Sequence, residues 1–297
     1  MTHAYYVCDV FTDQPYAGNP LAVVPDATGL SDQRMQQIAR EFNLSETTFV
    51  LPSDTPGRWR VRIFTPAFEV PFAGHPNIGT AFVLAASGRC GDWRDPRTLV
   101  FEEQAGEVPV TLSRDAEGMI WGELEAPEPL RLGETLSPAQ VAPALGLSPE
   151  DIRTEVHAPQ IASVGLPFLI VEAASANALR NAAVDIEALR QLMAGHETSF
   201  IHVYHRSDDD FDLHARMFAP LAGVSEDPAT GSANLALGAL LAHCDAADDG
   251  EWQWRITQGV EIGRPSVLNV RACRQAGRVS QTWVSGPSVM VAEGVLC

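Results

Sequence analysis

The sequence predicts an α+β protein that is built from two similar halves. The chain has 297 residues, which is enough for about two domains. Four short motifs of the first half recur in the same order in the second half. Strand-like segments also outnumber helix-like segments in each half. We therefore expect two pseudo-symmetric α+β domains, with duplication of one ancestral domain as the hypothesis for their origin.

The paired motifs follow one another at a nearly constant spacing. The offsets are 147, 151, 154 and 152 residues. The pairs are Asn19–Val24 with Leu166–Val171, Glu46–Val50 with Glu197–Ile201, Arg62–Pro66 with Arg216–Pro220, and Pro76–Ala81 with Pro228–Ala233. A spacing of half the chain is far too long for a solenoid repeat. Two similar domains are expected instead, and a different strand order in the two halves would contradict this.

In the first half, the residue pattern predicts two helices and several strands. Ser31 to Phe42 carries apolar residues at helical spacing, with Ser31 in the N-cap position. Arg58 to Phe64 alternates apolar and polar residues, as a half-buried strand does. A second, almost entirely apolar helix is expected at Asn77–Ser87. Further strands are expected at Tyr5–Val10, Leu99–Glu102, Val108–Leu112 and Ile120–Glu123.

The second half repeats this pattern. A helix is expected at Asp185–Gly195 and an apolar helix at Ala229–His243. The acidic segment Ser207–Asp210 has the composition of a hairpin turn. Strands are expected at Pro167–Val171, Phe200–His205, Leu213–Phe218, Trp252–Thr257 and Ser266–Val270.

A proline-containing connector separates the two halves. Leu124 to Leu136 includes Pro127 and Pro129, and such a segment is typical of a link between domains. We therefore place the domains at residues 1–126 and 127–297, and we expect the last strand of the chain to join the first domain.

The charge of the chain excludes several classes of partner and chemistry. The chain has 20 basic and 38 acidic residues, which gives a net charge of −18. This charge repels phosphate backbones and anionic lipids, so neither a nucleic acid nor a membrane is an expected partner. All the basic residues are arginines. A Schiff-base lysine and a phosphate-loop lysine are therefore excluded.

The cysteines and histidines do not form a ligand pattern. The five cysteines are widely spaced, which argues against a disulfide framework, a zinc ribbon or an iron–sulfur site. His202 and His205 fall on opposite faces of a strand, so we expect no metal site. The N-terminal segment has no signal-peptide pattern, and no stretch approaches about 18 apolar residues. We therefore expect a cytoplasmic protein.

The starts of the two apolar helices are the most specific local feature. In each, a proline falls near the first helical position, with His75 or Asp227 at or beside the N-cap. The first N–H groups of a buried helix need partners, and they hold anions well. An alternative is that Asp227 only caps its helix. For Ser232 and Thr80, the alternative is a hydrogen bond to the backbone of the first turn.

Glu46 is the other candidate, because it lies among apolar residues between a helix and a strand. A carboxylate in such surroundings has a raised pKa and transfers protons near neutral pH. Taken alone, Glu46 is also compatible with an exposed loop glutamate.

At these motifs the chain resembles the PhzF family, the phenazine-biosynthesis-like isomerases that share the diaminopimelate epimerase fold. The resemblance runs along the whole chain. It includes Asp9–Thr12 with Gly18–Pro20, Asn43–Glu46, Gly74–Pro76, Glu226–Ala233 and Gln258–Ser266. It implies two pseudo-symmetric domains, each a curled, mostly antiparallel sheet around a central helix, with the site in the cleft between them. It also implies a homodimer.

The resemblance implies a role for each matching residue. Glu46 matches the proton-transferring glutamate of the family. His75, Asp227 and Ser232 match residues that hold the substrate and assist the proton's path, and Gly74 and Gly231 match loop glycines that lie against the ligand. We add Asn77, in the first turn of the helix expected at Asn77–Ser87, as a substrate-binding candidate.

The same resemblance suggests a reaction without any cofactor. The best-known family member isomerises trans-2,3-dihydro-3-hydroxyanthranilate in this way. We thus expect a cofactor-independent isomerase of a small carboxylic acid, in which Glu46 removes a proton from one carbon and returns it to another. Alternatives are an epimerase or a lyase at the same site, and a non-catalytic protein that binds small acids.

Two observations limit the alternatives. The amino-acid epimerases and proline racemases of this fold use a cysteine at each helix start, and neither helix start here contains one. A two-thiol racemase is therefore not expected. Glu197 falls at the repeat position of Glu46, but its surroundings read as an ordinary strand, and we do not expect a second base there.

Overall fold

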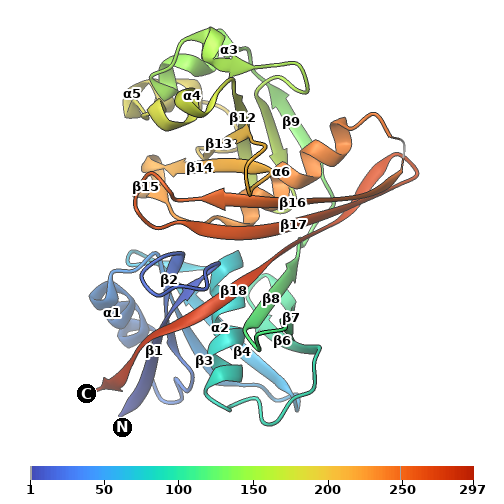
Figure 1. Cartoon of the computed structure of the whole chain (residues 1–297). Coiled ribbons are helices and arrows are strands. Elements are labelled where there is room, and N and C mark those ends of the chain that lie inside the picture. The colour runs from blue at the N-terminus through green and yellow to red at the C-terminus, as the bar shows by residue number, and fades with distance from the viewer. Residues whose placement is uncertain (1, 248) are drawn as a thin grey trace. The chain divides into compact units, whose positions relative to one another are not determined.

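The computed structural model describes residues 2–247 and 249–297, which form two compact units. Among the described residues, unit 1 comprises residues 2–125 and 285–297, and unit 2 comprises those from 126 to 284. Each unit is a mixed α/β structure with many strands and few helices (Figure 1). Among the described residues, no helix is long and apolar enough to cross a membrane.

The described part of unit 1 contains two helices, and most of its strands come from the first half of the chain. The helices are α1 (Asp32–Phe42) and α2 (Gly74–Ala86). The strands are β1 (His3–Val10), β2 (Asn19–Val24), β3 (Glu46–Pro52), β4 (Arg58–Phe64), β5 (Glu69–Val70), β6 (Arg97–Glu103), β7 (Gly106–Arg114) and β8 (Ile120–Glu125). The end of the long strand β18 (Arg278–Leu296) completes the unit.

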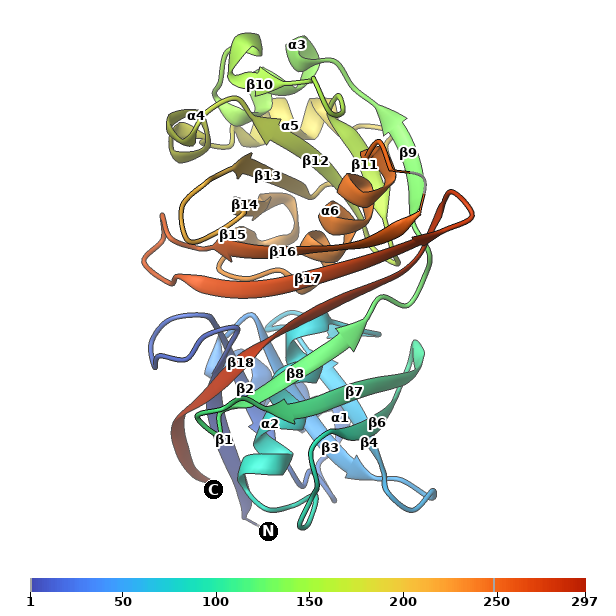
Figure 2. The ribbon, with the colours of Figure 1, turned by 45° about the vertical axis from the view of Figure 1, so that its right-hand side comes forward.

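The strands of unit 1 form a closed ring. Beginning at β1, each strand pairs with the next in the order β1, β2, β3, β4, β6, β7 and β8. Strand β18 pairs with both β8 and β1, so the pairings return to their starting point. Its antiparallel register with β1 runs from His3 opposite Leu296 to Val10 opposite Ser288. Figure 2 shows the end of β18 beside β1.

Helix α2 lies inside this ring. It contacts β1, β2, β3, β7 and β8, and its residues from Gly74 to Ala85 are all buried. A helix that is apolar on every side is stable only in a core, which explains this position. Gly79 permits the close packing, because a Cβ there would lie 2.6 Å from Leu21 Cδ2 and 2.8 Å from Val10 Cγ2.

Helix α1 packs against a different part of the same unit. Its apolar residues, including Met35 and Ile38, form a core cluster with Phe49 and Phe64 of the sheet. The helix begins as predicted, since Ser31 is the N-cap and its hydroxyl accepts a hydrogen bond from the Arg34 N–H at 3.3 Å. It ends at Asn43, whose φ of 51° places it in the left-handed region. This turn leads the chain directly into β3.

Unit 2 also contains a buried helix and a mixed sheet. Its helices are α3 (Pro138–Val141), α4 (Ala176–Asn181), α5 (Ile186–Leu192) and α6 (Gly231–Cys244). Its strands are β9 (Arg131–Thr135), β10 (Ile152–Arg153), β11 (Gln160–Ser163), β12 (Pro167–Ala173), β13 (Ile201–Arg206), β14 (Leu213–Ala219), β15 (Val224–Asp227), β16 (Gly250–Gln258) and β17 (Ser266–Gln275).

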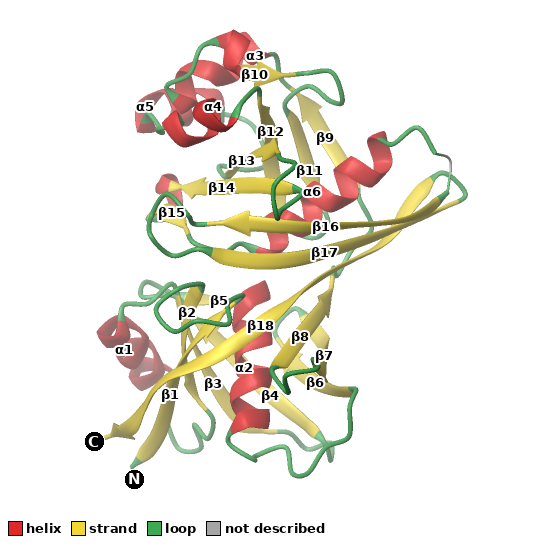
Figure 3. Ribbon diagram, in the orientation of Figure 1, coloured by secondary structure: helices red, strands yellow, loops and turns green. Residues whose placement is uncertain are grey.

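The strands of unit 2 pair in the order β9, β11, β12, β13, β14, β16 and β17. Two short strands extend this sheet, β10 on β12 and β15 on β14. Helix α6 contacts β11, β12, β16 and β17, and Figure 3 shows it beside β16 and β17. A second core cluster joins α3, α4 and α5 to the sheet, with Leu145, Leu189, Val171 and Val203 among its members.

Candidate active site

Glu46 is the first residue of β3, and a tight connection from α1 places it there. Its backbone pairs in parallel register with Leu21 of β2. The preceding residue, Ser45, donates a hydrogen bond from its hydroxyl to Asn19 Oδ1 at 3.2 Å. The Glu46 side chain is 19% exposed. The carboxylate is therefore held near the surface of the core and is still accessible to a ligand.

The structure brings Glu46 together with His75, as the sequence analysis grouped them. Nε2 of His75 lies 3.3 Å from Oε2 of Glu46. The distance alone fits an ion pair, but burial lowers the pKa of His75 to about 3, so the ring is neutral near pH 7. Only an N–H faces a carboxylate favourably, and we therefore assign the proton to Nε2. His75 is therefore a neutral ring beside the Glu46 carboxylate, and the Nε2–Oε2 contact itself lacks hydrogen-bond geometry.

The start of α2 differs from the predicted start. The sequence analysis began this helix at Asn77, whereas it begins at Gly74 with Ala73 as the N-cap. The N–H groups of the first helical turn have no partner within the helix, so the N–H that proline lacks is not needed there. His75 and Pro76 therefore fit inside the first turn. Ala73 provides no side-chain cap. The first N–H groups of α2, with the positive end of its dipole, are thus suited to an anion.

Gly74 and Asn77 belong to this first turn. Both residues are buried, and Asn77 is 0% exposed. The Asn77 side chain donates from Nδ2 to Ala73 O at 3.0 Å. In unit 1, the structure therefore places Gly74, His75 and Asn77 in one helical turn, with Glu46 in contact with that turn.

In unit 2, Asp227 lies before α6 and is not its N-cap residue. The sequence analysis expected this helix to begin at Ala229 with Asp227 at or beside the N-cap, but α6 begins at Gly231 and Thr230 is the N-cap. The Thr230 hydroxyl donates to Asp227 Oδ2 at 2.5 Å, so this hydroxyl is not used as a helix cap. Gly231 and Ser232 are the first two residues of α6, where Gly231 is buried and Ser232 is partly exposed.

Gln258 fixes the turn that carries Asp227, a role that the sequence analysis did not assign. Its Nε2 donates to Asp227 O at 2.8 Å and to Thr230 Oγ1 at 3.0 Å. Its Oε1 accepts from the Thr230 N–H at 3.2 Å and from Asn234 Nδ2 at 2.8 Å. All the polar capacity of this buried amide is therefore used to hold the turn.

Strand β15, which ends at Asp227, is held by an arginine. Arg216 makes a two-pronged ion pair with Glu226, with Nε–Oε1 and Nη2–Oε2 distances of 2.9 and 2.8 Å. Its Nη1 donates to the carbonyl oxygens of Leu179, Arg180 and Ala182. Such a fork is strong and directional, so it fixes the position of the residue before Asp227.

Glu103 is a second residue that the sequence analysis did not find. The predicted strand Leu99–Glu102 stopped one residue short of it, and β6 ends at Glu103. Burial raises the pKa of Glu103 to about 8, and a contact with the Asn77 side chain opposes this only in part. The sequence offered only the alternation of apolar and polar residues along this strand. Alternation does not show that the side chain of Glu103, the last strand residue, contacts the first turn of α2.

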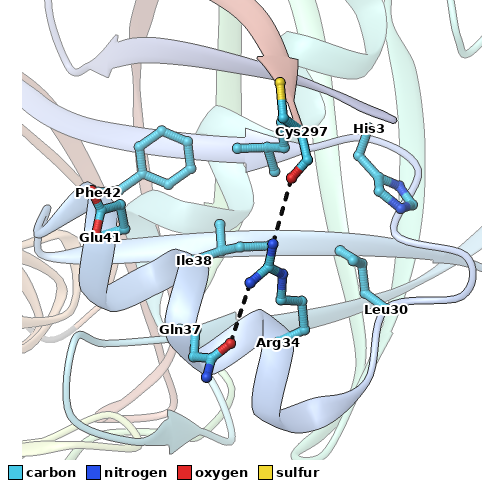
Figure 4. Close-up of a pocket in the computed structure, with 9 residues that line it drawn as sticks. His3, Leu30, Arg34, Gln37, Ile38, Glu41, Phe42 and Cys297 are labelled. Atoms are coloured by element: carbon cyan, nitrogen blue, oxygen red, sulfur yellow. Dashed lines mark hydrogen bonds between the residues drawn. The ribbon is translucent and has the colours of Figure 1, made fainter. Parts of the chain in front are cut away.

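One pocket in unit 1 is separate from these residues. Figure 4 shows it between α1 and the two ends of the chain, where Arg34 Nη2 donates to Cys297 O at 3.5 Å. None of the candidate residues lines it. Within residues 2–247 and 249–297, no three His, Cys, Asp or Glu side chains are grouped as metal ligands.

The comparison with known proteins identifies the family. The model of the PhzC-PhzF family, described as phenazine biosynthesis-like protein, matches residues 8–294. An uncharacterized isomerase of Mesorhizobium japonicum is 39% identical, with 99% of each chain covered. The trans-2,3-dihydro-3-hydroxyanthranilate isomerase of Pseudomonas aeruginosa is also 39% identical, with 98% of each chain covered.

A solved structure supports the same assignment. The PhzF-family phenazine biosynthesis protein of Bacillus anthracis superposes with a TM-score of 0.90 at 26% identity, and covers 100% of this chain and 99% of its own. Because the curated relatives are named isomerases, the class of this protein is an isomerase. The chain belongs to the PhzC-PhzF family of phenazine biosynthesis-like proteins. The resemblance noted from the sequence is thereby confirmed.

Proposed function

We propose that the protein moves a proton between two carbons of a small, cyclic carboxylic acid, and that trans-2,3-dihydro-3-hydroxyanthranilate is the first substrate to test. The relative from P. aeruginosa that carries this activity in its name is 39% identical over nearly the whole chain. The observation that carries the chemistry is the 3.3 Å contact between Glu46 and a neutral His75 at the start of a buried helix.

Glu46 is the acid and base in this proposal, and His75 and Asp227 assist it. The Glu46 carboxylate takes a proton from a substrate carbon, and the electron pair left behind is delocalised into the adjoining double bonds. The same carboxyl group then returns the proton to a second carbon, so no external oxidant or reductant is needed. His75, whose Nε2 lies 3.3 Å from the Glu46 carboxylate, keeps the carboxylate oriented during both transfers in this proposal.

Gly74, Asn77, Gly231 and Ser232 bind the substrate in this proposal. The uncapped N–H groups of α2 are suited to the substrate carboxylate and to negative charge that develops on the ring. Asp227 is fixed by Thr230 and Gln258, which suits a group that must present its carboxylate in one direction. The roles of Gly74, Gly231, Ser232 and Asp227 follow from their match to the family motifs, whereas Asn77 is proposed from its place in the first turn of α2.

We also propose that the two units are pseudo-symmetric domains of the epimerase type. The support is the order of strand pairings within each unit. In unit 1, the pairings from β1 through β2, β3, β4 and β6 to β7 are antiparallel, parallel, antiparallel, parallel and antiparallel. In unit 2, the pairings from β11 through β12, β13, β14 and β16 to β17 follow the same sequence of directions.

The homodimer remains a prediction from the family resemblance, and the cytoplasmic location remains a prediction from the sequence pattern. We propose a cytoplasmic homodimer that needs no cofactor or metal. Sedimentation equilibrium tests the dimer, and an unchanged rate after treatment with a chelator is the result expected for the reaction.

The proposal is tested by the rate of substrate conversion in matched variants. We expect Glu46→Gln to lower kcat at least about 1000-fold, because an amide cannot accept the proton, while ligand binding is kept. The control is Glu197→Gln, which removes the glutamate at the repeat position. Its side chain is 40% exposed and is paired with Arg131 at 2.9 Å, and we expect full activity. Conversion by Glu46→Gln at the wild-type rate would contradict the proposal.

Two other outcomes would identify the alternatives. Exchange of a substrate proton with solvent without net isomerisation would indicate an epimerase or a lyase. Tight binding of small acids that is unaffected by Glu46→Gln, with no conversion of any of them, would indicate a binding protein.

A further inference from the structure

The turn between β6 and β7 brings a carboxyl group to the start of α2. Glu103 is the last residue of β6 and lies opposite Gly106 of β7. Within the turn, the Ala105 N–H donates to Pro71 O at 3.2 Å. Pro71 lies in the short segment that leads into α2, so this hydrogen bond fixes the turn beside the first helical residues.

Glu103 and Asn77 meet at this place. The Asn77 side chain is 0% exposed, and its contact with the Glu103 carboxyl affects the ionisation of that group. The contact is long or poorly aligned, because neither Glu103 oxygen has a partner with hydrogen-bond geometry among the described residues. Both Glu103 oxygens and Asn77 Oδ1 are nevertheless buried.

Three buried polar atoms without hydrogen-bond partners at one place are unusual in a folded protein. Asn77 Nδ2 donates one of its two N–H groups to Ala73 O, whereas the acceptor Asn77 Oδ1 has no hydrogen-bond partner among the described residues. Burial keeps Glu103 largely protonated near pH 7, since its pKa is raised to about 8. A protonated carboxyl group offers one O–H donor. The place therefore offers the Glu103 O–H as a donor and Asn77 Oδ1 as an acceptor, neither of which has a partner among the described residues.

We propose that Glu103 and Asn77 form a subsite for an uncharged hydroxyl group of the substrate. A hydroxyl group accepts one hydrogen bond through its oxygen, here from Glu103, and donates one through its hydrogen, here to Asn77 Oδ1. A second carboxylate fits poorly, because it has no hydrogen to donate to Asn77. The inference rests on the proposed function, since it assigns the substrate of the same site as a hydroxylated cyclic acid.

The subsite shares its helical turn with the catalytic candidates. Asn77 is two residues from His75 in α2, and His75 contacts Glu46. A substrate held at the start of α2 by its carboxylate therefore has both the base and the hydroxyl subsite close to that same turn. Glu103 is thus a specificity-determining residue, whereas the proton transfer belongs to Glu46.

The test compares two stable acids that differ only by one hydroxyl group. Binding of 3-hydroxyanthranilate and of anthranilate is measured by calorimetry at pH 7 in wild type, Glu103→Leu and Asn77→Ala. We expect wild type to prefer the hydroxylated acid by about tenfold, the size of one or two good hydrogen bonds. Each variant is expected to lose this preference by binding 3-hydroxyanthranilate as weakly as anthranilate.

Two matched variants show whether the preference for 3-hydroxyanthranilate is lost because of the Glu103 side chain itself or because of general damage to the protein. Glu102→Gln changes the neighbouring residue, whose carboxylate accepts from Ser53 Oγ at 2.9 Å, and it should keep the full preference. Glu103→Gln retains a donor and an acceptor of the same shape, and it should keep most of the preference even if Glu103→Leu does not fold.

Each remaining outcome overturns a different claim. Equal binding of both acids by wild type, or an equal loss for both in Glu103→Leu, would overturn the subsite while leaving the role of Glu46 intact. A preserved preference without any Glu46-dependent conversion would overturn the proposed function and leave the hydroxyl subsite standing.

Discussion

His75 Nε2 lies 3.3 Å from Glu46 Oε2, at the start of a helix that the sheet of unit 1 surrounds. The imidazole is 8% exposed and the carboxylate side chain is 19% exposed. A neutral imidazole leaves the negative charge of a neighbouring carboxylate uncompensated, whereas a cation at this distance would stabilise that charge. This contact therefore suits a carboxylate whose task is to remove a proton from carbon.

The protonation state of His75 is the first prediction. Because burial lowers the pKa of His75 to about 3, the ring should remain neutral, with its proton on Nε2, between pH 8 and pH 5. Long-range ¹H–¹⁵N correlation spectra of the labelled protein report both nitrogens, and His75→Gln identifies the signals of this ring. A doubly protonated ring at pH 6 would contradict the assignment.

The second prediction concerns the turn that carries Asp227. Gln258→Leu removes four hydrogen bonds from a buried position and should lower the free energy of unfolding by about 2–4 kcal/mol. It should also lower kcat more than it raises KM, since Asp227 loses its fixed direction. Urea unfolding and steady-state kinetics measure the two effects.

Gln253→Leu is the matched control for this variant. Gln253 lies on the same strand, β16, and is exposed. We expect less than about 0.5 kcal/mol change in unfolding free energy for such a surface substitution. Equal effects of the two variants would show that Gln258 has no special role at the turn.

The third prediction is a pH-dependent stability that is due to Glu103. The pKa of Glu103 is raised from 4.5 to about 8 in the folded protein. Between these values the folded state binds more protons at this group than the unfolded state, so its contribution to stability falls as the pH rises. Above about pH 8 the contribution is constant.

Glu103→Gln removes this dependence. Relative to wild type, the variant should gain stability as the pH rises from 5 to 8, by on the order of a few kcal/mol. Urea unfolding at several pH values measures the gain, with Glu102→Gln as the control for loss of a carboxyl group. A difference between Glu103→Gln and wild type that is independent of pH would contradict the raised pKa.

The sequence predicts much of the fold because local patterns determine many of its elements. Ser31 caps α1 as predicted, Asp185 caps α5, and the acidic segment Ser207–Asp210 lies in the turn between β13 and β14. In each case the deciding interaction lies within a few residues of chain. The predicted connector, in contrast, was wrong in part, because residues 131–135 form β9 by pairing with the distant β11.

The starts of the two buried helices illustrate the same limit. Proline suggested similar starts for both, but α2 begins before Pro76 and α6 begins after Pro228. The difference arises from Gln258 and Asp227, which bind Thr230 and fix the turn before α6. Gln258 comes from a distant strand, and the burial of Glu103 depends on a turn that packs against Pro71. No local pattern reports such contacts.

The most direct test of the account is deuterium incorporation followed by NMR in deuterated buffer. Wild type, Glu46→Gln and Glu197→Gln are incubated with trans-2,3-dihydro-3-hydroxyanthranilate and with related cyclic acids. The account predicts deuterium at a product carbon for wild type and for Glu197→Gln, and none above background for Glu46→Gln. Equal incorporation by Glu46→Gln and wild type would contradict the central claim that Glu46 transfers the proton.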